Sequence, residues 1–403
     1  MTAGARGPAP AATRSYGGYA VPAEVRKMWR QAPVREVTAP DGRRAWLVTG
    51  MEHVRTVLSD PRFSRAEARR LGAVIAAAAI FSQPGMLDLD PPEHSRLRRL
   101  VAPAFSARRV RALRPRIQQI TGELLALLAD SGPPADLNER LCFPLPIAVI
   151  CEILGVPYAD RDRFRGWSER VMSTSAYPPE EAMGALSSLT GYIAGLIAAK
   201  RRDPDASLLQ DLITARDEQD RLSEDELVHV GFGLLVAGHE TTANMLGKGL
   251  VALLDHPDQL AALRADPSLA PAAVEEVLRC VTLGSRPAGG LVRATTCEAE
   301  LGGVTIPAHS VVLASTPAAN LDPSAFPDPD RFDLTRPGAD GHVTFGHGPH
   351  HCLGAQLARM ELEVAFTSLL AAFPGLKLAV PPEELTYTGG MLITGLRTLP
   401  VTW

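Results

Sequence analysis

The amino-acid sequence predicts a mainly α-helical fold, a large helical domain with a small β-rich side. After about residue 50, most of the chain carries apolar residues at helical spacing, in runs bounded by capping residues and prolines. Two short stretches instead place β-branched residues around turn signals. Although 403 residues could form two or three domains, no linker interrupts the chain. We therefore expect one domain, residues 21–403, after a disordered Ala/Gly/Pro-rich leader, residues 1–20.

The expected elements follow in chain order. Residues 34–37 and 45–49 predict a hairpin across Pro40-Asp41-Gly42-Arg43, with a helix after it at 52–59. Strands are expected at 300–306, around a Gly-Gly turn, and at 311–314. The remaining helices are expected at 106–128, 145–154, 160–172, 179–201, from a cap at Ser223 to a stop at Asp255, from near Pro271, and at 355–372.

Composition excludes several classes of protein. The net charge of −4 argues against general nucleic-acid binding. Five unclustered cysteines, an odd number, fit a reducing cytosol. The most apolar short stretch, residues 73–81, is far shorter than the roughly twenty residues of a membrane-spanning helix, and the N-terminus lacks the apolar core of a signal peptide. We expect a cytoplasmic protein with no nucleic-acid or membrane partner.

Near the C-terminus, Cys352 lies in a glycine-rich loop that leads directly into the helix expected at 355–372. The loop sequence is Phe345-Gly346-His347-Gly348-Pro349-His350-His351-Cys352-Leu353-Gly354. Glycines allow a tight loop with inward N–H groups, and a helix N-terminus lowers the pKa of a thiol. The pattern therefore predicts that Cys352 is a stable thiolate that binds a metal ion.

Two alternatives compete with this interpretation. A cysteine at a helix start is more often a buried structural residue, and zinc is conceivable because several histidines lie near Cys352. Structural zinc sites, however, draw on paired CxxC or HxxxH clips. The other cysteines form no such pair; they are Cys142, Cys151, Cys280 and Cys297. One thiolate, with its remaining coordination supplied by another group, indicates haem, where an axial Cys favours O–O cleavage.

The loop around Cys352 resembles the FGxGxHxCxG ligand loop of the cytochrome P450 haem-thiolate monooxygenases. The resemblance covers nearly the whole chain, from about Val21 to Trp403. It implies the cytochrome P450 fold, haem b as cofactor, and the soluble bacterial type that lacks a membrane anchor. It also implies that Cys352 is the iron ligand and that Phe345, Gly346 and Leu353 contact the haem.

A second motif lies in the long helix that starts after Ser223. Its capping box, Ser223 with Glu226, opens a run of about thirty residues, or roughly 45 Å. The central Ala237-Gly238-His239-Glu240-Thr241-Thr242 is, on its own, equally a bent core helix with two ordinary threonines. It resembles the family's (A/G)Gx(D/E)T segment, which implies that Thr241 hydrogen-bonds dioxygen and its water while Glu240 relays protons. His239 is expected to pack or to make a local hydrogen bond.

Two further motifs carry charged residues. Glu276 and Arg279 alone indicate an ordinary surface pair, but they match the family's ExxR, which implies a buried structural triad completed by Arg331. Residues 90–99, in a helix expected to start at a proline, alone indicate a surface charge cluster. Their resemblance to DPPEHxxxR implies that His94 and Arg98 donate to the haem propionates, and Arg293 and His350 match the family's other propionate contacts. Charge-assisted bonds to carboxylates are strong.

The substrate side carries the weakest pattern. Segments that match the family's pocket stretches contain apolar residues, as any buried wall does. These residues are Met86, Leu234, Ala237, Leu283, Leu291, Leu392 and Ile393. We expect an apolar natural product, such as a macrolide, another polyketide or a steroid-like molecule.

The predicted activity is a monooxygenase that inserts one oxygen atom from O2 by hydroxylation or epoxidation, with electrons from a ferredoxin and its reductase. A haem-thiolate peroxygenase fed by hydrogen peroxide is the alternative enzyme, and a haem or zinc sensor the non-catalytic one; the Glu240-Thr241 pair argues against both. Between residues 91 and 116, one acid faces eight arginines, which predict a surface that attracts an acidic ferredoxin. The arginines are Arg96, Arg98, Arg99, Arg108, Arg109, Arg111, Arg114 and Arg116.

Overall fold

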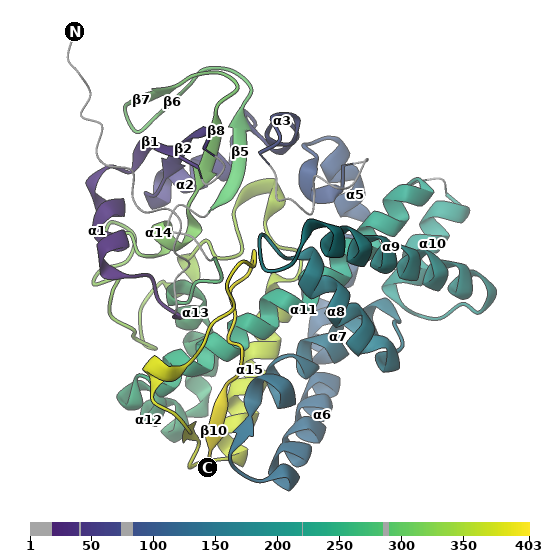
Figure 1. The fold of residues 1–403 in the computed structure, drawn as a ribbon, viewed down its shortest axis with the longest axis vertical. Helices are drawn as coiled ribbons and strands as arrows, with labels where there is room; N and C mark the ends of the chain where they lie inside the picture. The colour runs from purple at the N-terminus through teal and green to yellow at the C-terminus, as the bar shows by residue number, and fades with distance from the viewer. Residues whose placement is uncertain (1–17, 40–41, 74–83, 220, 285–289) are drawn as a thin grey trace.

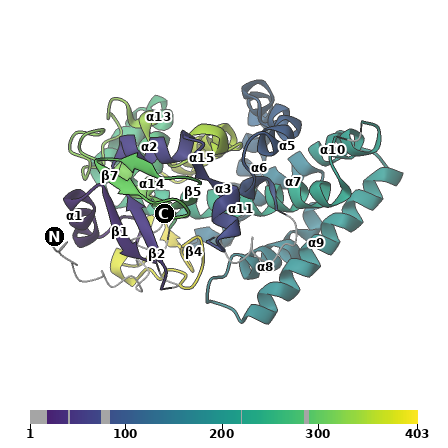
Figure 2. The ribbon, with the colours of Figure 1, turned by 90° about the horizontal axis from the view of Figure 1, so that it is seen from above.

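The computed structural model describes residues 18–39, 42–73, 84–219, 221–284 and 290–403. Helices make up most of this chain, and the strands gather at one end of the molecule (Figure 1). Figure 2 shows the β-rich part beside α1 (Ala23–Gln31) and the long helices extending away from it. The expected fold class, mainly α with a small β-rich side, is confirmed.

Helix α11 (Glu224–Leu254) runs through the middle of the helical part (Figure 1). The Ser223 side chain accepts a hydrogen bond from the Glu226 N–H, and the Glu226 carboxylate accepts one from the Ser223 N–H, so the predicted capping box is present. Helices from both halves of the chain pack on α11, including α7 (Pro144–Leu154), α9 (Pro179–Arg202), α10 (Leu208–Asp217), α12 (Pro257–Ala265), α13 (Ala270–Cys280) and α15 (Ala355–Ala372).

The other long helices pack around this centre. α5 (Glu93–Val101) leads towards α6 (Ala107–Ser131), which packs on α15, while α8 (Arg161–Val171) packs on α9. The predicted helices match these elements to within a few residues. Five helices of the described residues escaped prediction, because runs of five to ten residues show too few turns for a helical period to be recognised. They are α1, α3 (Arg65–Arg70), α10, α12 and α14 (Thr316–Asn320).

A five-stranded sheet forms the β-rich side, in the order β1-β2-β8-β5-β3. The predicted hairpin is the antiparallel pair β1 (Val34–Thr38) and β2 (Arg44–Val48), followed by α2 (Met51–Ser59). Strand β8 (Val311–Ala314) pairs parallel to β2, with Trp46 opposite Val312, and antiparallel to β5 (Leu291–Thr295). β3 (Phe63–Ser64) closes the other edge. β5 was not predicted, yet it carries Arg293 into the centre of the fold.

Two smaller sheets complete the strands of the described residues. β6 (Ala299–Leu301) and β7 (Val304–Ile306) form the hairpin expected around the Gly-Gly turn, where Gly302 and Gly303 both have positive φ. β10 (Pro400–Thr402) pairs with β4 (Ala135–Asp136) and with β9 (Lys377–Leu378). The C-terminal strand thus ties the end of the chain to the helices around α6.

Two features bear on the expected leader and on membranes. Most of the expected leader, residues 1–17, lies outside the described residues, but Tyr19 is fixed: its hydroxyl donates to the Asp255 carboxylate and its carbonyl accepts from the Thr282 N–H. One described helix, α9, is long and apolar enough to cross a membrane by length and composition alone. It packs against α8, α10 and α11 and buries Leu189 and Ile193, and 28% of its most apolar stretch is buried.

Candidate active site

The loop before α15 folds back on itself around Cys352. The Cys352 N–H donates to the Phe345 carbonyl (2.8 Å), and the Gly346 N–H donates to the Val343 carbonyl (2.9 Å). Gly346 and Gly348 have φ values of +77° and +70°, and a Cβ on Gly348 would lie 2.5 Å from the Leu58 carbonyl oxygen at the end of α2. Glycine is therefore required for both the turn and the close approach.

The thiol of Cys352 differs from the sequence prediction. Its side chain is exposed, but the surrounding protein desolvates it enough to raise its pKa above the ordinary value. The Gly354 N–H and the positive charges of Arg98 and Arg359 act in the opposite direction without reversing the shift. The helix N-terminus alone therefore does not make a stable thiolate. A coordinated cation does so directly, because it favours the deprotonated sulfur.

A network of charged side chains on α13 and α15 contacts Phe345 of the loop. The sequence analysis did not predict it. Glu275 on α13 accepts two hydrogen bonds from Arg359 on α15 (2.6 and 3.0 Å), and the Arg359 guanidinium lies 4.6 Å from the centre of the Phe345 ring. Nε2 of His342 is 3.1 Å from the Glu275 carboxylate. Burial raises the pKa of Glu275, but His342 and Arg359 outweigh it and hold the pKa at about 2. Only tertiary contacts reveal this network.

Glu276 and Arg279 form a fully buried pair on α13, as the resemblance implied. Arg279 donates to both carboxylate oxygens of Glu276, at 2.7 and 2.8 Å, and both side chains have no exposed surface. The Arg279 guanidinium also donates to the Asn320 and Pro329 carbonyls, each at 2.9 Å. These hydrogen bonds satisfy donors of Arg279 and both carboxylate oxygens of Glu276, as a buried charge pair requires.

The prediction that Arg331 completes a buried triad with Glu276 and Arg279 is wrong. Its side chain is 67% exposed and reaches only Asp333, at 3.7 Å, and only its carbonyl joins the cluster. Arg336 takes the place instead: Nε lies 3.1 Å from the Glu276 carboxylate, and 6% of its side chain is exposed. The reason is packing of the neighbouring Phe332, which is buried and stacks on His256 at 4.6 Å, so Arg331 points outward.

The cluster is connected to the Cys352 loop through Asn320. Its side-chain oxygen accepts from the Val343 N–H (2.8 Å), and its amide donates to the Thr344 hydroxyl (2.7 Å), which in turn donates to the Leu278 carbonyl (2.6 Å). Arg279 holds Asn320 through its main chain. The buried ion pairs on α13 therefore fix the two residues immediately before Phe345.

A second group of basic residues gathers on the other side of the loop. The four predicted donors come together here: the His94 and His350 rings are 4.0 Å apart, Arg293 is buried on β5, and Arg98 donates to the His351 carbonyl (2.6 Å). His94 and Arg98 also line one cavity of about 410 Å³. Arg65 joins them; its side chain is 11% exposed and lies 3.6 Å from the Asp88 carboxylate. No motif in the sequence indicated it.

This group fits a ligand that carries carboxylates. Nδ1 of His94 and both ring nitrogens of His350 are buried without a hydrogen-bond partner among the described residues. Burial, together with the neighbouring positive charges, lowers the pKa of His350 to about 3, and burial with the nearby Arg65 lowers that of Arg293 to about 9. Two carboxylates would satisfy these donors and supply the missing negative charge.

The middle of α11 is open on one side. Ala237 is exposed and Gly238 and Thr241 are partly exposed, although the helix is buried before and after them. The Thr241 hydroxyl donates to the Ala237 carbonyl (2.9 Å), and the helix continues without interruption. A Cβ on Gly238 would lie 2.8 Å from the Ile150 side chain of α7. The absence of a Cβ at Gly238 therefore lets α7 pack closely against this part of α11.

Glu240 points into a buried polar environment. Burial and the nearby Glu169 raise its pKa to about 7, against the opposing charge of Arg165 and a hydrogen bond from Asn244. A carboxyl group with this pKa gains and loses protons readily near neutrality. His239 is fully buried, and its Nδ1 lies 2.7 Å from the Leu235 carbonyl, so the expected local hydrogen bond is confirmed.

Asn244 connects Glu240 to the C-terminal hairpin, residues 387–396, in which Tyr387 pairs with Leu396. Its amide donates to the Glu240 carbonyl at 2.7 Å, and it lies 3.4 Å from the Glu240 carboxylate. On its other side, a Cβ on Gly395 would lie only 1.6 Å from the Asn244 side-chain oxygen. Gly395 itself is held by Thr388 across the hairpin, through bonds of 2.8 and 2.9 Å. The hairpin main chain therefore rests directly on Asn244.

The predicted pocket residues are only partly brought together. The Thr394 N–H donates to the Leu283 carbonyl (2.9 Å), and Gly284 forms a bridge with Ile393, so Leu283, Leu392 and Ile393 lie side by side. Leu291 is 38% exposed on β5. Met86 and Leu234 pack, partly buried, against the helical core, and Ala237 faces the open side of α11. Parts of the pocket stretches, residues 74–83 and 285–289, lie outside the described residues.

Comparison with known proteins agrees with this geometry. The family model "Cytochrome P450" matches residues 180–384. Nocardicin C N-oxygenase of Nocardia uniformis subsp. tsuyamanensis is 46% identical over 98% of this chain and 97% of its own. Mycinamicin IV hydroxylase/epoxidase of Micromonospora griseorubida is 46% identical over 92% of each chain. The structure of the LnmA cytochrome P450 hydroxylase of Streptomyces atroolivaceus superimposes with a TM-score of 0.88, at 46% identity over 98% of this chain and 99% of its own.

The chain belongs to the cytochrome P450 family. It is a cytochrome P450 monooxygenase, and its cofactor is haem b. Haem b supplies the iron at which dioxygen is reduced and one oxygen atom is made available to the substrate. The Cys352 thiol just before α15 fits the iron of this cofactor. The partnerless ring nitrogens of His94 and His350, with Arg98 and Arg293, fit its two propionates.

Proposed function

We propose that this protein hydroxylates or epoxidises an apolar natural product, such as a macrolide, another polyketide or a steroid-like molecule, in the cytoplasm. In this proposal residues 21–403 form one haem-thiolate domain. The names of several relatives support the substrate class, among them 6-deoxyerythronolide B hydroxylase of Saccharopolyspora erythraea and vitamin D(3) 25-hydroxylase of Pseudonocardia autotrophica. The observation that carries the proposal is that the Cys352 loop lies next to the basic residues His94, Arg98 and His350.

The cofactor contacts follow from the chemistry of the side chains. Cys352 ligates the iron as a thiolate, and Phe345, Gly346 and Leu353 contact the haem from the loop. Four side chains with unsatisfied or desolvated donors hold the propionates: His94, Arg98, Arg293 and His350. Bonds from these donors to carboxylates are charge-assisted, so they fix the tilt of the ring.

Proton delivery is assigned to α11. The Thr241 hydroxyl lies on the open side and is anchored by the Ala237 carbonyl, which leaves its oxygen free to accept a hydrogen bond from water beside the substrate dioxygen. The Glu240 carboxyl holds a proton near neutral pH and releases it towards Thr241 through water. Arg165 and Glu169 lie near Glu240, and Arg165 pairs with the exposed Glu139 (2.6 Å). In this proposal they connect Glu240 to solvent.

The substrate proposal is tested by screening macrolides, other polyketides and steroids for the shift from low-spin to high-spin iron on binding. A compound that binds should then be oxidised when NADPH, ferredoxin and reductase are supplied, with one atom of ¹⁸O from ¹⁸O2 in the product. Turnover with hydrogen peroxide that equals or exceeds the NADPH-driven rate would instead favour a peroxygenase.

Thr241→Ala should uncouple electron use from product formation. Without the hydroxyl, protons are delivered less selectively, so hydrogen peroxide is released and the product formed per NADPH falls several-fold. Thr242→Ala, at the buried neighbouring position, is the matched control and should keep the wild-type ratio. Product and NADPH are measured in the same reaction. An unchanged ratio in Thr241→Ala would remove this residue from proton delivery.

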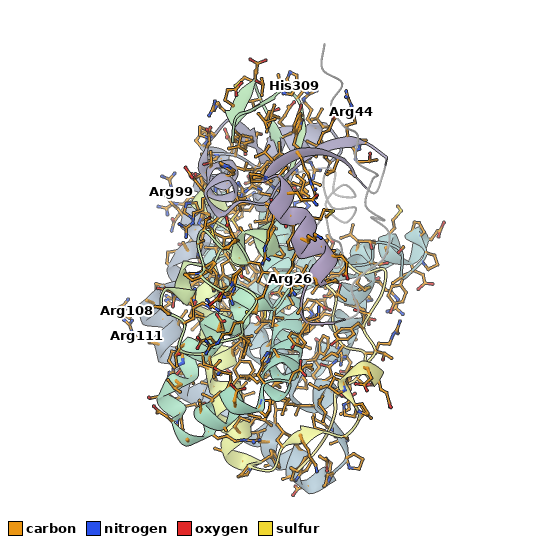
Figure 3. The ribbon with its side chains drawn as sticks, turned by 90° about the vertical axis from the view of Figure 1, so that its left-hand side faces the viewer. Arg26, Arg44, Arg99, Arg108, Arg111 and His309 are labelled. Carbon is orange, nitrogen blue, oxygen red and sulfur yellow. The ribbon has the colours of Figure 1, made fainter. Side chains whose placement is uncertain are left out.

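The basic surface proposed to bind a ferredoxin is smaller than the sequence predicted. Arg98 points inward, and four of the other seven arginines are paired with acids: Arg96 with Glu226, Arg109 with Asp211, Arg114 with Glu363 and Arg116 with Glu152. Arg99, Arg108 and Arg111 are exposed and have no ion-pair partner in the described part of the chain. Figure 3 shows all three pointing outward on the same side. These three arginines form the basic surface.

Arg99→Glu or Arg108→Glu should slow reduction by an acidic ferredoxin several-fold, because the charge that steers the partner is reversed. Stopped-flow reduction measured over an ionic-strength series should show the wild-type rate falling with salt. Arg44→Glu, far from this surface in Figure 3, is the control. The carbon-monoxide spectrum should be unchanged in all variants. If the reduction rate changes neither with salt nor with charge reversal, the ferredoxin binds outside the basic surface.

A further inference from the structure

Lys248 is a buried cation that the steps above do not use. It lies on α11, two turns after Thr241, and only 1% of it is exposed. Its Nζ donates to the Thr282 carbonyl (2.9 Å) and lies 5.7 Å from the centre of the Tyr387 ring. No carboxylate lies within ion-pair distance of it in the residues that the structure describes. Burying an unpaired ammonium group costs stability, so this lysine is an unfavourable choice for packing alone.

The residue that Lys248 contacts is held from a second side. Thr282 follows α13 and is 4% exposed, and its N–H donates to the Tyr19 carbonyl (3.0 Å). The Tyr19 hydroxyl in turn donates to Asp255 at the end of α11. Both main-chain groups of Thr282 are therefore fixed by residues distant in the sequence, although the residue belongs to no helix or strand.

The two residues after Thr282 lie against the C-terminal hairpin. The Leu283 carbonyl accepts from the Thr394 N–H (2.9 Å), and Gly284 forms a bridge with Ile393. Leu283 and Ile393 are two of the residues proposed to line the substrate pocket. A shift of the Thr282 carbonyl would therefore move Leu283 relative to Ile393.

We propose that Lys248 is a positioning residue for substrate specificity: its hydrogen bond to the Thr282 carbonyl sets the place of Leu283 in the pocket wall. This inference rests on the proposed function, because it takes Leu283 and Ile393 as substrate contacts. Lys248 itself does not touch the substrate. It acts through the 282–284 segment.

The electrostatics give the proposal a pH signature. Burial alone lowers the pKa of Lys248 from 10.5 to about 7. The ionisable side chain that faces it is Tyr387, which interacts in turn with Asp255 and Tyr19. Burial raises the pKa of Tyr387 and of Tyr19, which keeps both neutral, and no charged group contributes to the shift of Lys248. The folded state thus loses the Lys248 proton at a lower pH than the unfolded state. The cost of burying the charge is fully present below pH 7 and fades between pH 7 and about 10.5.

The test replaces Lys248 with Met, which has a similar volume and no donor. In the holoenzyme, amide hydrogen exchange of residues 282–284 should rise at least threefold. The Kd of 4-phenylimidazole, whose phenyl group enters the pocket, should rise at least threefold, whereas the Kd of imidazole should not change. The melting temperature should stay equal or rise, because an unpaired buried charge is removed, and this gain should shrink from pH 7 to pH 10.

Leu250→Ala, a core change in the same helix, is the matched control. It should lower the melting temperature while leaving the exchange at 282–284 and the ratio of the two imidazole affinities at wild-type values. If Lys248→Met leaves either the exchange or that ratio unchanged, the proposal is overturned and Lys248 is a core residue only. If neither the wild type nor the variants bind imidazole, the proposed haem site fails, and the exchange result alone decides whether Lys248 holds the segment.

Discussion

Replacing Cys352 with Ser or His should abolish both the far-red-shifted Soret band of the reduced, carbon-monoxide-bound protein and NADPH-driven turnover. The band and the chemistry share one cause, a thiolate that donates electron density to the iron. The carbon-monoxide spectrum and the turnover rate are both measured on protein reconstituted with haem. Because the protein around Cys352 raises the pKa of its thiol, the free thiol should also titrate above its ordinary range in haem-free protein.

Cys297→Ser, at an exposed position on the β-rich side, is the matched control and should leave the Soret band and turnover unchanged. If Cys352→Ser keeps the red-shifted band, another side chain is the ligand and the assignment of the whole loop is lost.

Arg336→Leu should destabilise the protein by about 3 kcal/mol, the lower end of the range for removing one partner of a buried ion pair. Arg336 is 6% exposed and shares the Glu276 carboxylate with Arg279, so its loss leaves part of a buried negative charge unpaired. Arg331→Leu should change stability by less than about 0.5 kcal/mol, as is usual for an exposed side chain. Urea unfolding followed by circular dichroism compares the two variants directly.

The opposite ranking, with Arg331→Leu the more harmful change, would restore the triad that the sequence motif implied. The two variants also test the support of the Cys352 loop. Arg279 bonds the Asn320 carbonyl, and the Asn320 side chain bonds residues 343 and 344 before the loop. Arg336→Leu should therefore also weaken haem retention, whereas Arg331→Leu should not.

The confusion of these two arginines shows where sequence patterns stop. Helices with caps and a long apolar period were predictable, because both signals are local. Arg331 and Arg336 lie in a segment without regular structure, where no period tells which side chain faces inward. That choice is made by the neighbouring Phe332, which packs on His256 in the turn between α11 and α12.

Other parts of the site depended on a known motif or on a tertiary contact. The four donors His94, Arg98, Arg293 and His350 come from three separate segments, and only the family motif could group them. Arg65, Glu275 and Arg359 belong to no motif that was recognised, so their roles near the loop became visible only in the structure. The pKa of Cys352 also depends on desolvation, which the sequence does not report.

The contact between Gly395 and Asn244 limits how the substrate range of this protein can be engineered. A library that diversifies the C-terminal hairpin treats residues 392 to 396 as equivalent pocket positions. Any side chain at Gly395 would displace Asn244, which holds Glu240, so selection for a new substrate there would also select on the efficiency of oxygen use. Randomising Leu392 and Ile393 while keeping Gly395 separates the two properties.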